Sequence, residues 1–247
     1  MCAFDFDGTL APIVEHPTDA AISERTRLLL TRLAALYPVV ILSGRSRADL
    51  IPRLRGIAFA RIIGNHGAET EHEDHNALSQ IRRWKAAVEL GIAPLPGLWL
   101  EDKGLSLAVH YRQTEKKAEA RQLIDEVTRG LPRVRVIGGK QVVNLVIDGA
   151  PDKGNALISE RERLDCKTVL YVGDDDNDED AFAAEGDVVG VRVGRKRTSH
   201  AKYFLRSQDE IDRLLELLVL LRDPDEAVAL CERQRQRKLA GHALASQ

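Results

Sequence analysis

The chain is poor in several residue types, and each shortage excludes a class of protein. Its three cysteines, at positions 2, 166 and 231 of 247, are odd in number and far apart. They are typical of reduced thiols in a cytoplasmic protein and exclude a disulfide framework. Aromatic residues make up 4% and the net charge is -2, so neither base stacking nor bulk electrostatics favours a nucleic-acid partner. No apolar run reaches the ~20 residues of a membrane span.

What is present begins with the stretch Asp5-Phe6-Asp7-Gly8-Thr9-Leu10, which follows a short apolar strand. In an extended segment, side chains two apart point to the same side. Asp5 and Asp7 can therefore converge on one metal ion or one phosphorus atom, and a cation would offset their repulsion. The alternative is an ordinary strand that ends in an Asp-Gly turn.

The rest of the chain alternates between predicted strands and helices. Apolar runs predict strands at 2–6, 39–42, 61–63, 168–172, 188–193 and 203–205, and helices are expected at 24–36, 47–54, 153–163 and 209–221. Ser23 and Ser46 are placed to cap the first two helices. Continuous apolar strands separated by helices are typical of a doubly wound, Rossmann-like parallel sheet. A charged helical tail is expected after Pro224.

The alternation changes between residues 76 and 150. A helix with Trp84, a hairpin at 98–112, a second helix at 115–129 and a second hairpin around Gly138-Gly139 follow one another. This order predicts an α+β domain, residues 76–150, inserted into an α/β core of residues 1–75 and 151–247. Trp84 and Trp99 are expected to be packing residues. His72 and His75 are expected to lie in a solvated polar loop.

Four polar loops follow predicted core strands, at 5–9, 43–45, 64–67 and 173–178. Sites in open α/β sheets form beyond the carboxyl ends of the strands. Lys153 precedes a helix on the same side of the sheet. Carboxylates, a hydroxyl, a lysine and glycine backbone are suited to a hard cation and a phosphate. The residues therefore predict phosphoryl chemistry.

In this order, the motifs resemble those of the haloacid dehalogenase (HAD) superfamily of phosphatases. The four pieces are Asp5–Leu10, Ser43-Gly44-Arg45, Asp152-Lys153-Gly154, and Gly173-Asp174-Asp175 with Asp178. The segments 64–69, 101–112 and 178–182 are similar to those of trehalose-6-phosphate phosphatases. The resemblance implies a HAD-like core with an α+β cap, and a Mg²⁺-dependent hydrolase that converts trehalose 6-phosphate to trehalose and phosphate.

The resemblance also implies roles for individual residues. Asp5 would be the nucleophile that becomes an aspartyl-phosphate, and Asp7 the general acid and base. Ser43, Gly44 and Lys153 would bind the phosphoryl group. The Mg²⁺ ligands would come from Asp5, Asp7 (by its carbonyl), Asp174, Asp175 and Asp178. Sugar contacts are carried over to Arg45, Asn65, His66, Glu101, Lys103, His110, Arg112 and Asn144. We expect a cytoplasmic monomer that acts on a small-molecule sugar phosphate, without nucleic-acid or membrane partners.

Departures from the pattern leave the substrate open. Trehalose-phosphate phosphatases usually have a sugar-binding Glu where this chain has Asn144, and commonly a Thr where it has Asn177. Another sugar phosphate or a phosphorylated sugar acid is therefore the alternative substrate, and an inactive sugar-phosphate sensor is the alternative outside enzymes. His66 has a structural reading as a buried histidine, and His110 with Arg112 a reading as solvated strand residues.

Overall fold

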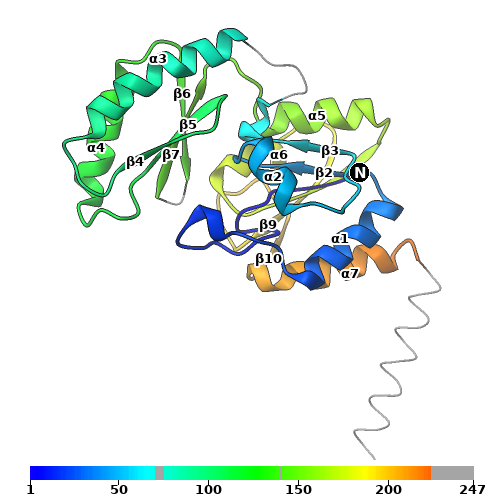
Figure 1. Ribbon diagram of the computed structural model, residues 1–247. Coiled ribbons are helices and arrows are strands. Elements are labelled where there is room, and N and C mark those ends of the chain that lie inside the picture. Colours follow the sequence, from blue (N-terminus) through cyan, green and yellow to red (C-terminus); the bar gives the residue numbers. More distant parts are fainter. Residues whose placement is uncertain (70–74, 140, 224–247) are drawn as a thin grey trace, which may run out of the picture.

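The computed structural model contains two β-sheets that lie side by side (Figure 1). It describes residues 1–69, 75–139 and 141–223. The expected tail after Pro224, His72 and Lys140 lie outside the described residues. Of the helices in these ranges, none combines the length and apolarity that crossing a membrane requires.

The larger sheet is parallel throughout, with the order β10-β9-β8-β1-β2-β3. Its strands are β1 (Cys2–Phe4), β2 (Val39–Leu42), β3 (Arg61–Ile63), β8 (Thr168–Gly173), β9 (Asp187–Val193) and β10 (Tyr203–Leu205). The chain adds strands outward on one side of β1, then returns and adds strands on the other. The switch point therefore lies between β1 and β8, where a doubly wound sheet opens a crevice.

Helices cover both faces of this sheet, as its apolar strands require. On one face lie α1 (Glu24–Leu36), α2 (Arg47–Arg53) and α7 (Ile211–Leu220), and on the other α5 (Lys153–Arg163) and α6 (Glu179–Phe182). The serine caps are confirmed, because Ser23 accepts from the Thr26 amide and Ser46 from the Asp49 amide. The doubly wound α/β prediction is therefore correct.

The smaller sheet is antiparallel, with the order β4-β5-β7-β6. It comprises β4 (Trp99–Asp102), β5 (Ser106–His110), β6 (Val134–Gly139) and β7 (Val142–Ile147), and α3 (His75–Ile92) and α4 (Lys117–Arg129) cover one face (Figure 1). Trp84 is buried between these helices and the sheet, with an exposed fraction of 1%. The opposite face carries the side chains that matter for the site.

Two local predictions were wrong. Gly138 and Gly139 belong to β6, where they pair with Val143 and Val142, so the hairpin turns later than the glycines indicated. His75 is the first residue of α3 and does not lie in a loop. In both cases a strand or helix continues through residues that are common in turns, because pairing and packing outweigh local preference.

Candidate active site

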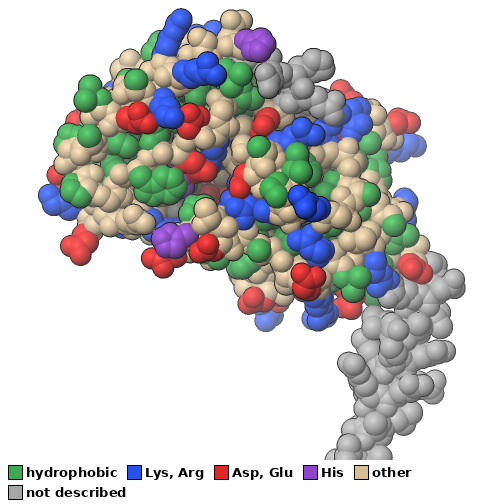
Figure 2. Space-filling model, in the orientation of Figure 1, with side chains coloured by type: hydrophobic (Ala, Val, Ile, Leu, Met, Phe, Trp, Pro, Cys, Tyr) green, Lys and Arg blue, Asp and Glu red, His purple; other side chains and the backbone are tan. Residues whose placement is uncertain are grey.

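A cleft of about 440 Å³ opens between the two sheets. Figure 2 shows the hollow, with acidic and basic side chains gathered around it. Its volume lies within the range of small-molecule sites, about 300–1,000 Å³. Asp5, Asp7, Asp174 and Asp175 line one side of the cleft, and the antiparallel sheet supplies the other. We call these the floor and the roof.

The floor is organised around a buried lysine. Lys153, at the first position of α5, donates to Asp5 Oδ1 at 2.8 Å and to Asp178 Oδ1 at 2.6 Å. Asp178 Oδ1 also accepts from the Tyr171 hydroxyl at 2.6 Å. Helix α5 can begin there because Asp152 caps it in a reciprocal capping box. The Asp152 helix cap thus places Lys153 next to the end of β1.

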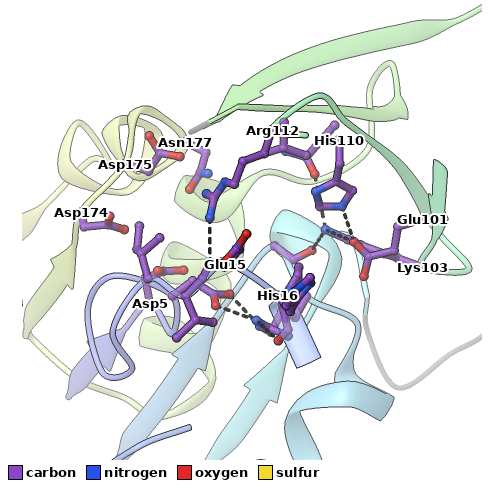
Figure 3. Close-up of a pocket in the computed structure, with 18 of the residues that line it drawn as sticks. Asp5, Glu15, His16, Glu101, Lys103, His110, Arg112, Asp174, Asp175 and Asn177 are labelled. Atoms are coloured by element: carbon purple, nitrogen blue, oxygen red, sulfur yellow. Dashed lines mark hydrogen bonds and ion pairs between the residues drawn. The ribbon is translucent and has the colours of Figure 1, made fainter. Parts of the chain in front are cut away.

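Asp178 holds the loop after β8 in place. Its Oδ2 accepts from the backbone amides of Asp174 and Asp175, both at 2.9 Å. With Lys153 and Tyr171 on Oδ1, each oxygen of Asp178 accepts two hydrogen bonds, which fix the orientation of this carboxylate. Asp174 is directed into the cleft beside Asp5 (Figure 3). Asp175 caps the short helical turn at 176–178 through the Asp176 amide.

The electrostatics of the floor follow from its burial. Burial, reinforced by Asp178 and Asp174, raises the pKa of Asp5 well above its usual range despite Lys153. Burial alone would lower the pKa of Lys153, but Asp178 and Asp5 outweigh it and raise the pKa. One ammonium group therefore stabilises a group of three carboxylates only in part. A further cation at this position would favour the ionised form of Asp5.

The donor set fits a hard divalent cation. Carboxylate oxygens of Asp5, Asp174 and Asp178 lie within 4.8 Å of one another and all three residues are buried. Oxygen donors of this kind suit Mg²⁺. Gly8, at φ +78°, passes so close that a Cβ there would lie 2.2 Å from Asp174 Oδ2. Glycine at this position therefore leaves the room in which Asp174 sits next to Asp5.

Asp7 is bound by a forked arginine. Arg45 donates to Asp7 Oδ2 through Nε and to Oδ1 through Nη2, both at 2.7 Å, and to Asp49 through Nη1 at 2.7 Å. A further bond reaches the carbonyl of Pro17. Such bidentate pairs fix orientation as well as charge. Arg45 lines the cleft, but its hydrogen bonds position Asp7.

Ser43, Gly44 and His66 form the wall next to the floor. Ser43 is buried and its carbonyl accepts from the His66 amide at 2.9 Å. The His66 ring lies so close to Gly44 that a Cβ there would be 2.5 Å from it. Both ring nitrogens are buried, and the Asn144 side chain is a hydrogen-bonding neighbour of the ring. Burial, together with Lys103 and Lys153, lowers the pKa of His66 well below its usual range, so His66 is neutral.

The roof residues come from neighbouring strands of the antiparallel sheet (Figure 3). His110 contacts Glu101 at 2.8 Å through Nε2, and Lys103 Nζ lies 3.8 Å from the same carboxylate. Lys103 also donates to the Gly44 carbonyl at 3.0 Å and to Asn144 Oδ1 at 3.4 Å. Burial lowers the pKa of Lys103, although Glu101 opposes it. The face with His110 is thus the cleft face, not the solvated one.

Two residues predicted as sugar contacts also make hydrogen bonds between the two sheets and their loops. Asn65 does not line the cleft; its amide donates to the Lys103 carbonyl at 3.1 Å and to Glu69 at 2.9 Å, and accepts from Ser106 at 2.5 Å. Arg112 does line the cleft, and it donates to the Val14 carbonyl at 2.7 Å. Both residues therefore hold the roof against the core.

Three features of the site were missed from the sequence. Tyr171 supports Asp178 from inside the sheet. The segment 13–17 lines the cleft. Trp99 lines it too and is 37% exposed, so the packing prediction for it was wrong. A signal was available for Trp99, because it alternates with Glu101 and Lys103 and must share their face.

Comparison with known proteins agrees with this geometry. The family model described as Trehalose-phosphatase matches residues 3–209. The chain belongs to the trehalose-phosphatase family. That match runs through both sheets and includes every site residue described above. The family implies a divalent metal ion, which the buried aspartates fit.

Individual proteins that are similar to this chain are named trehalose-phosphate phosphatases. A trehalose-phosphate phosphatase of Mycobacterium avium is 35% identical over 93% of this chain and 60% of its own length. This chain therefore spans about 60% of that relative. Among solved structures, a trehalose-6-phosphate phosphatase related protein has 25% identity and a TM-score of 0.73, covering 90% of this chain and 98% of its own. The C-terminal domain of the Candida albicans trehalose-6-phosphate phosphatase shares the fold, with 22% identity, a TM-score of 0.75, and coverage of 88% and 91%.

Proposed function

We propose that this chain is a Mg²⁺-dependent phosphatase that hydrolyses trehalose 6-phosphate to trehalose and phosphate. The observation that carries the proposal is the floor, where Lys153 lies between Asp5 and Asp178 with Asp174 alongside, below a polar roof. The names of the relatives support the choice of substrate. In this proposal residues 76–150 act as a cap inserted into a core of residues 1–75 and 151–247.

The proposed reaction proceeds in two steps at Asp5. A carboxylate oxygen of Asp5 forms a bond to phosphorus while the bond from phosphorus to the sugar oxygen breaks, and Asp7 gives a proton to that oxygen. Asp7 then takes a proton from a water molecule, whose oxygen attacks the aspartyl-phosphate and releases the Asp5 carboxylate. Arg45 holds Asp7 at the entrance to the floor for both transfers.

The other floor residues bind the transferring group. Lys153, with the Ser43 hydroxyl and the Gly44 backbone, would hold phosphoryl oxygens beside Asp5. Asp5, Asp174 and the Asp7 carbonyl would hold the metal ion, and Asp178 and Asp175 would orient the loop that carries Asp174. Bound Mg²⁺ would supply positive charge to the phosphoryl oxygens. Charge stabilisation and positioning are the main requirements of phosphoryl transfer.

Asn144 favours a second candidate substrate class. Its buried amide occupies the cleft beside Lys103, where relatives of this kind usually have a carboxylate. An amide both donates and accepts, and carries no charge. In the roof, Lys103 therefore has Glu101, at 3.8 Å, as its acidic neighbour among the described residues. A sugar acid phosphate would supply the missing carboxylate.

The test is phosphate release from a panel of substrates with the full chain. Trehalose 6-phosphate, glucose 6-phosphate, mannose 6-phosphate and 6-phosphogluconate would be compared at equal concentrations, with and without chelator and with Mg²⁺ restored. We expect fastest release from trehalose 6-phosphate, lost with chelator and recovered with Mg²⁺. Faster release from the acid would favour the second class, whereas binding without Mg²⁺-dependent release from any substrate would indicate a sensor.

A further inference from the structure

The cleft changes character along its length. Its inner part is polar and contains Glu101, Lys103 and Asn144 opposite the floor. Its outer part combines apolar side chains, Ile13 and Val14 from the loop after β1 and Trp99 and Val142 from the roof, with the polar side chains of Glu15, His16, His110 and Arg112. Ile13 and Trp99 are 43% and 37% exposed. A small polar phosphate ester does not account for the four apolar side chains in this part of the cleft.

Strand register places the two parts in successive rows. Trp99 pairs with His110, and His110 with Val142, which makes one row. The next row on the same face contains Glu101, Ala108 and Asn144. Such rows lie about 7 Å apart, because a strand rises about 3.4 Å per residue. Lys103, beyond the second row, contacts the core at Gly44. The first row continues to Gly139, which pairs with Val142 and where a Cβ would lie 3.3 Å from Asp175 Oδ2. This row therefore approaches the floor at its β6 end, and Trp99 lies at the opposite, β4 end.

Trp99 is held in a fixed orientation. Its ring stacks on His110 at 3.9 Å between centroids and 7° between planes, and the edge of His110 is bound to Glu101 at 2.8 Å. The two tryptophans differ, because Trp84 is 1% exposed and Trp99 37%. A large ring that is partly exposed in a cleft and already immobilised gives contact area at little entropic cost.

We propose that Trp99 determines specificity by packing against the second sugar ring of a disaccharide phosphate, the ring that carries no phosphate. This inference deepens the proposed function and rests on it. The phosphorylated ring occupies the polar inner part of the cleft, next to the floor. The C–H face of the second ring covers the exposed part of the Trp99 indole. A monosaccharide phosphate fills only the inner part of the cleft. Trp99 therefore separates disaccharide from monosaccharide substrates.

Steady-state kinetics test this separation. Wild type, Trp99→Ala and Trp99→Phe would be assayed with trehalose 6-phosphate and glucose 6-phosphate. For Trp99→Ala we expect KM for the disaccharide to rise about 10–200-fold, the range for a lost apolar contact, with kcat and both constants for glucose 6-phosphate nearly unchanged. Trp99→Phe keeps an aromatic face for His110 and should recover most of the affinity. Val136→Ala, at an exposed position of the same sheet outside the cleft, should change nothing.

Two kinetic outcomes would overturn the inference. Equal increases in KM for both substrates, or a fall in kcat, would mean that Trp99 only supports His110. Unchanged KM for the disaccharide in Trp99→Ala would exclude contact with the substrate. Failure of the proposed function looks different, because wild type itself would then release no phosphate from either sugar.

Fluorescence gives a readout that needs no turnover. The chain has two tryptophans, and one is buried away from the cleft. Titration with trehalose should change the emission of wild type and of Asp5→Asn, but not that of Trp99→Phe, which retains only Trp84. Glucose should have a much smaller effect. No response of wild type to trehalose would contradict the proposed contact even if the phosphatase activity is present.

Discussion

The floor and the roof of the cleft each contain a buried lysine, and the two lysines differ in their partners and in the direction of their pKa shifts. Lys153 lies within 2.8 Å of two carboxylates, and its pKa is raised. Lys103 is 3.8 Å from one carboxylate and donates to a backbone carbonyl, and its pKa is lowered. The floor therefore has an excess of carboxylates around a fully paired ammonium, whereas the roof holds a buried ammonium with incomplete charge compensation. An anionic or hydroxyl-rich ligand would supply the acceptors that the Lys103 ammonium lacks.

The largest expected effect comes from replacing Asp5, the proposed nucleophile. Asp5→Asn should lower kcat by about 10⁴-fold or more, because single deletions in a concerted catalytic set have effects of this size. Its stability should be equal to or above that of wild type, since a buried carboxylate with a raised pKa is removed. Phosphate release and urea unfolding measure the two quantities. Normal turnover by this variant would exclude the mechanism.

Lys153→Met should affect activity and stability together. Removing one partner of a buried charge cluster leaves Asp5 and Asp178 without their shared donor, which costs about 3–5 kcal/mol. Lys153→Arg is the control: it keeps the charge but not the compact ammonium between two carboxylates, so it should regain stability more than turnover. Urea unfolding and phosphate release at saturating substrate are the measurements. Full stability of the Met variant would contradict the ion cluster in the floor.

Lys103→Met provides the direct comparison with Lys153. The roof lysine makes a charged hydrogen bond, worth about 1.5–3 kcal/mol, so kcat/KM should fall about 10–100-fold. Stability should change little or rise, because a buried ammonium with a lowered pKa disappears. A large loss of stability in this variant, similar to that of Lys153→Met, would remove the distinction between floor and roof.

The smallest expected effect is a pH dependence that belongs to His66. The folded protein keeps this side chain neutral, with its pKa well below the usual value, while the unfolded chain binds a proton near pH 6.5. Stability from this group is therefore present above pH 6.5 and is lost as the pH falls through that value, by at most about 1.4 kcal/mol per pH unit. Urea unfolding between pH 7.5 and 5 measures the slope.

His66→Asn is the matched variant for this measurement. Asn tolerates the left-handed conformation that His66 adopts, with φ +59°, and it does not titrate. Its unfolding free energy should therefore fall less steeply with decreasing pH than that of wild type. Parallel slopes for the two proteins would show that His66 does not contribute.

Much of the fold and of the floor could be predicted from sequence. Continuous apolar runs identify the strands of a sheet covered on both faces, and the order of the polar loops after them indicates which edge they share. Asp5, Lys153 and Asp174 accordingly lie together as expected. These predictions depend on local periodicity and chain order, which a sequence displays directly.

Side-chain partners in the roof and wall could not be predicted in the same way. Arg45 binds Asp7 across 38 residues, and Asn65 binds Ser106 across 41. Both types of side chain suit sugar hydroxyls equally well, so residue type alone does not distinguish a substrate contact from a contact within the protein. The choice depends on the three-dimensional placement of loops, within the core sheet for Arg45 and between the two sheets for Asn65, which no local pattern encodes.

The conformation of Gly8 limits which mutations the site can tolerate at this position. Its φ is +78°, and any Cβ would collide with the Asp174 carboxylate. Every amino acid that a single base change can produce from a glycine codon carries a Cβ. Every missense change that a single base can cause at this codon therefore introduces the same steric conflict with Asp174.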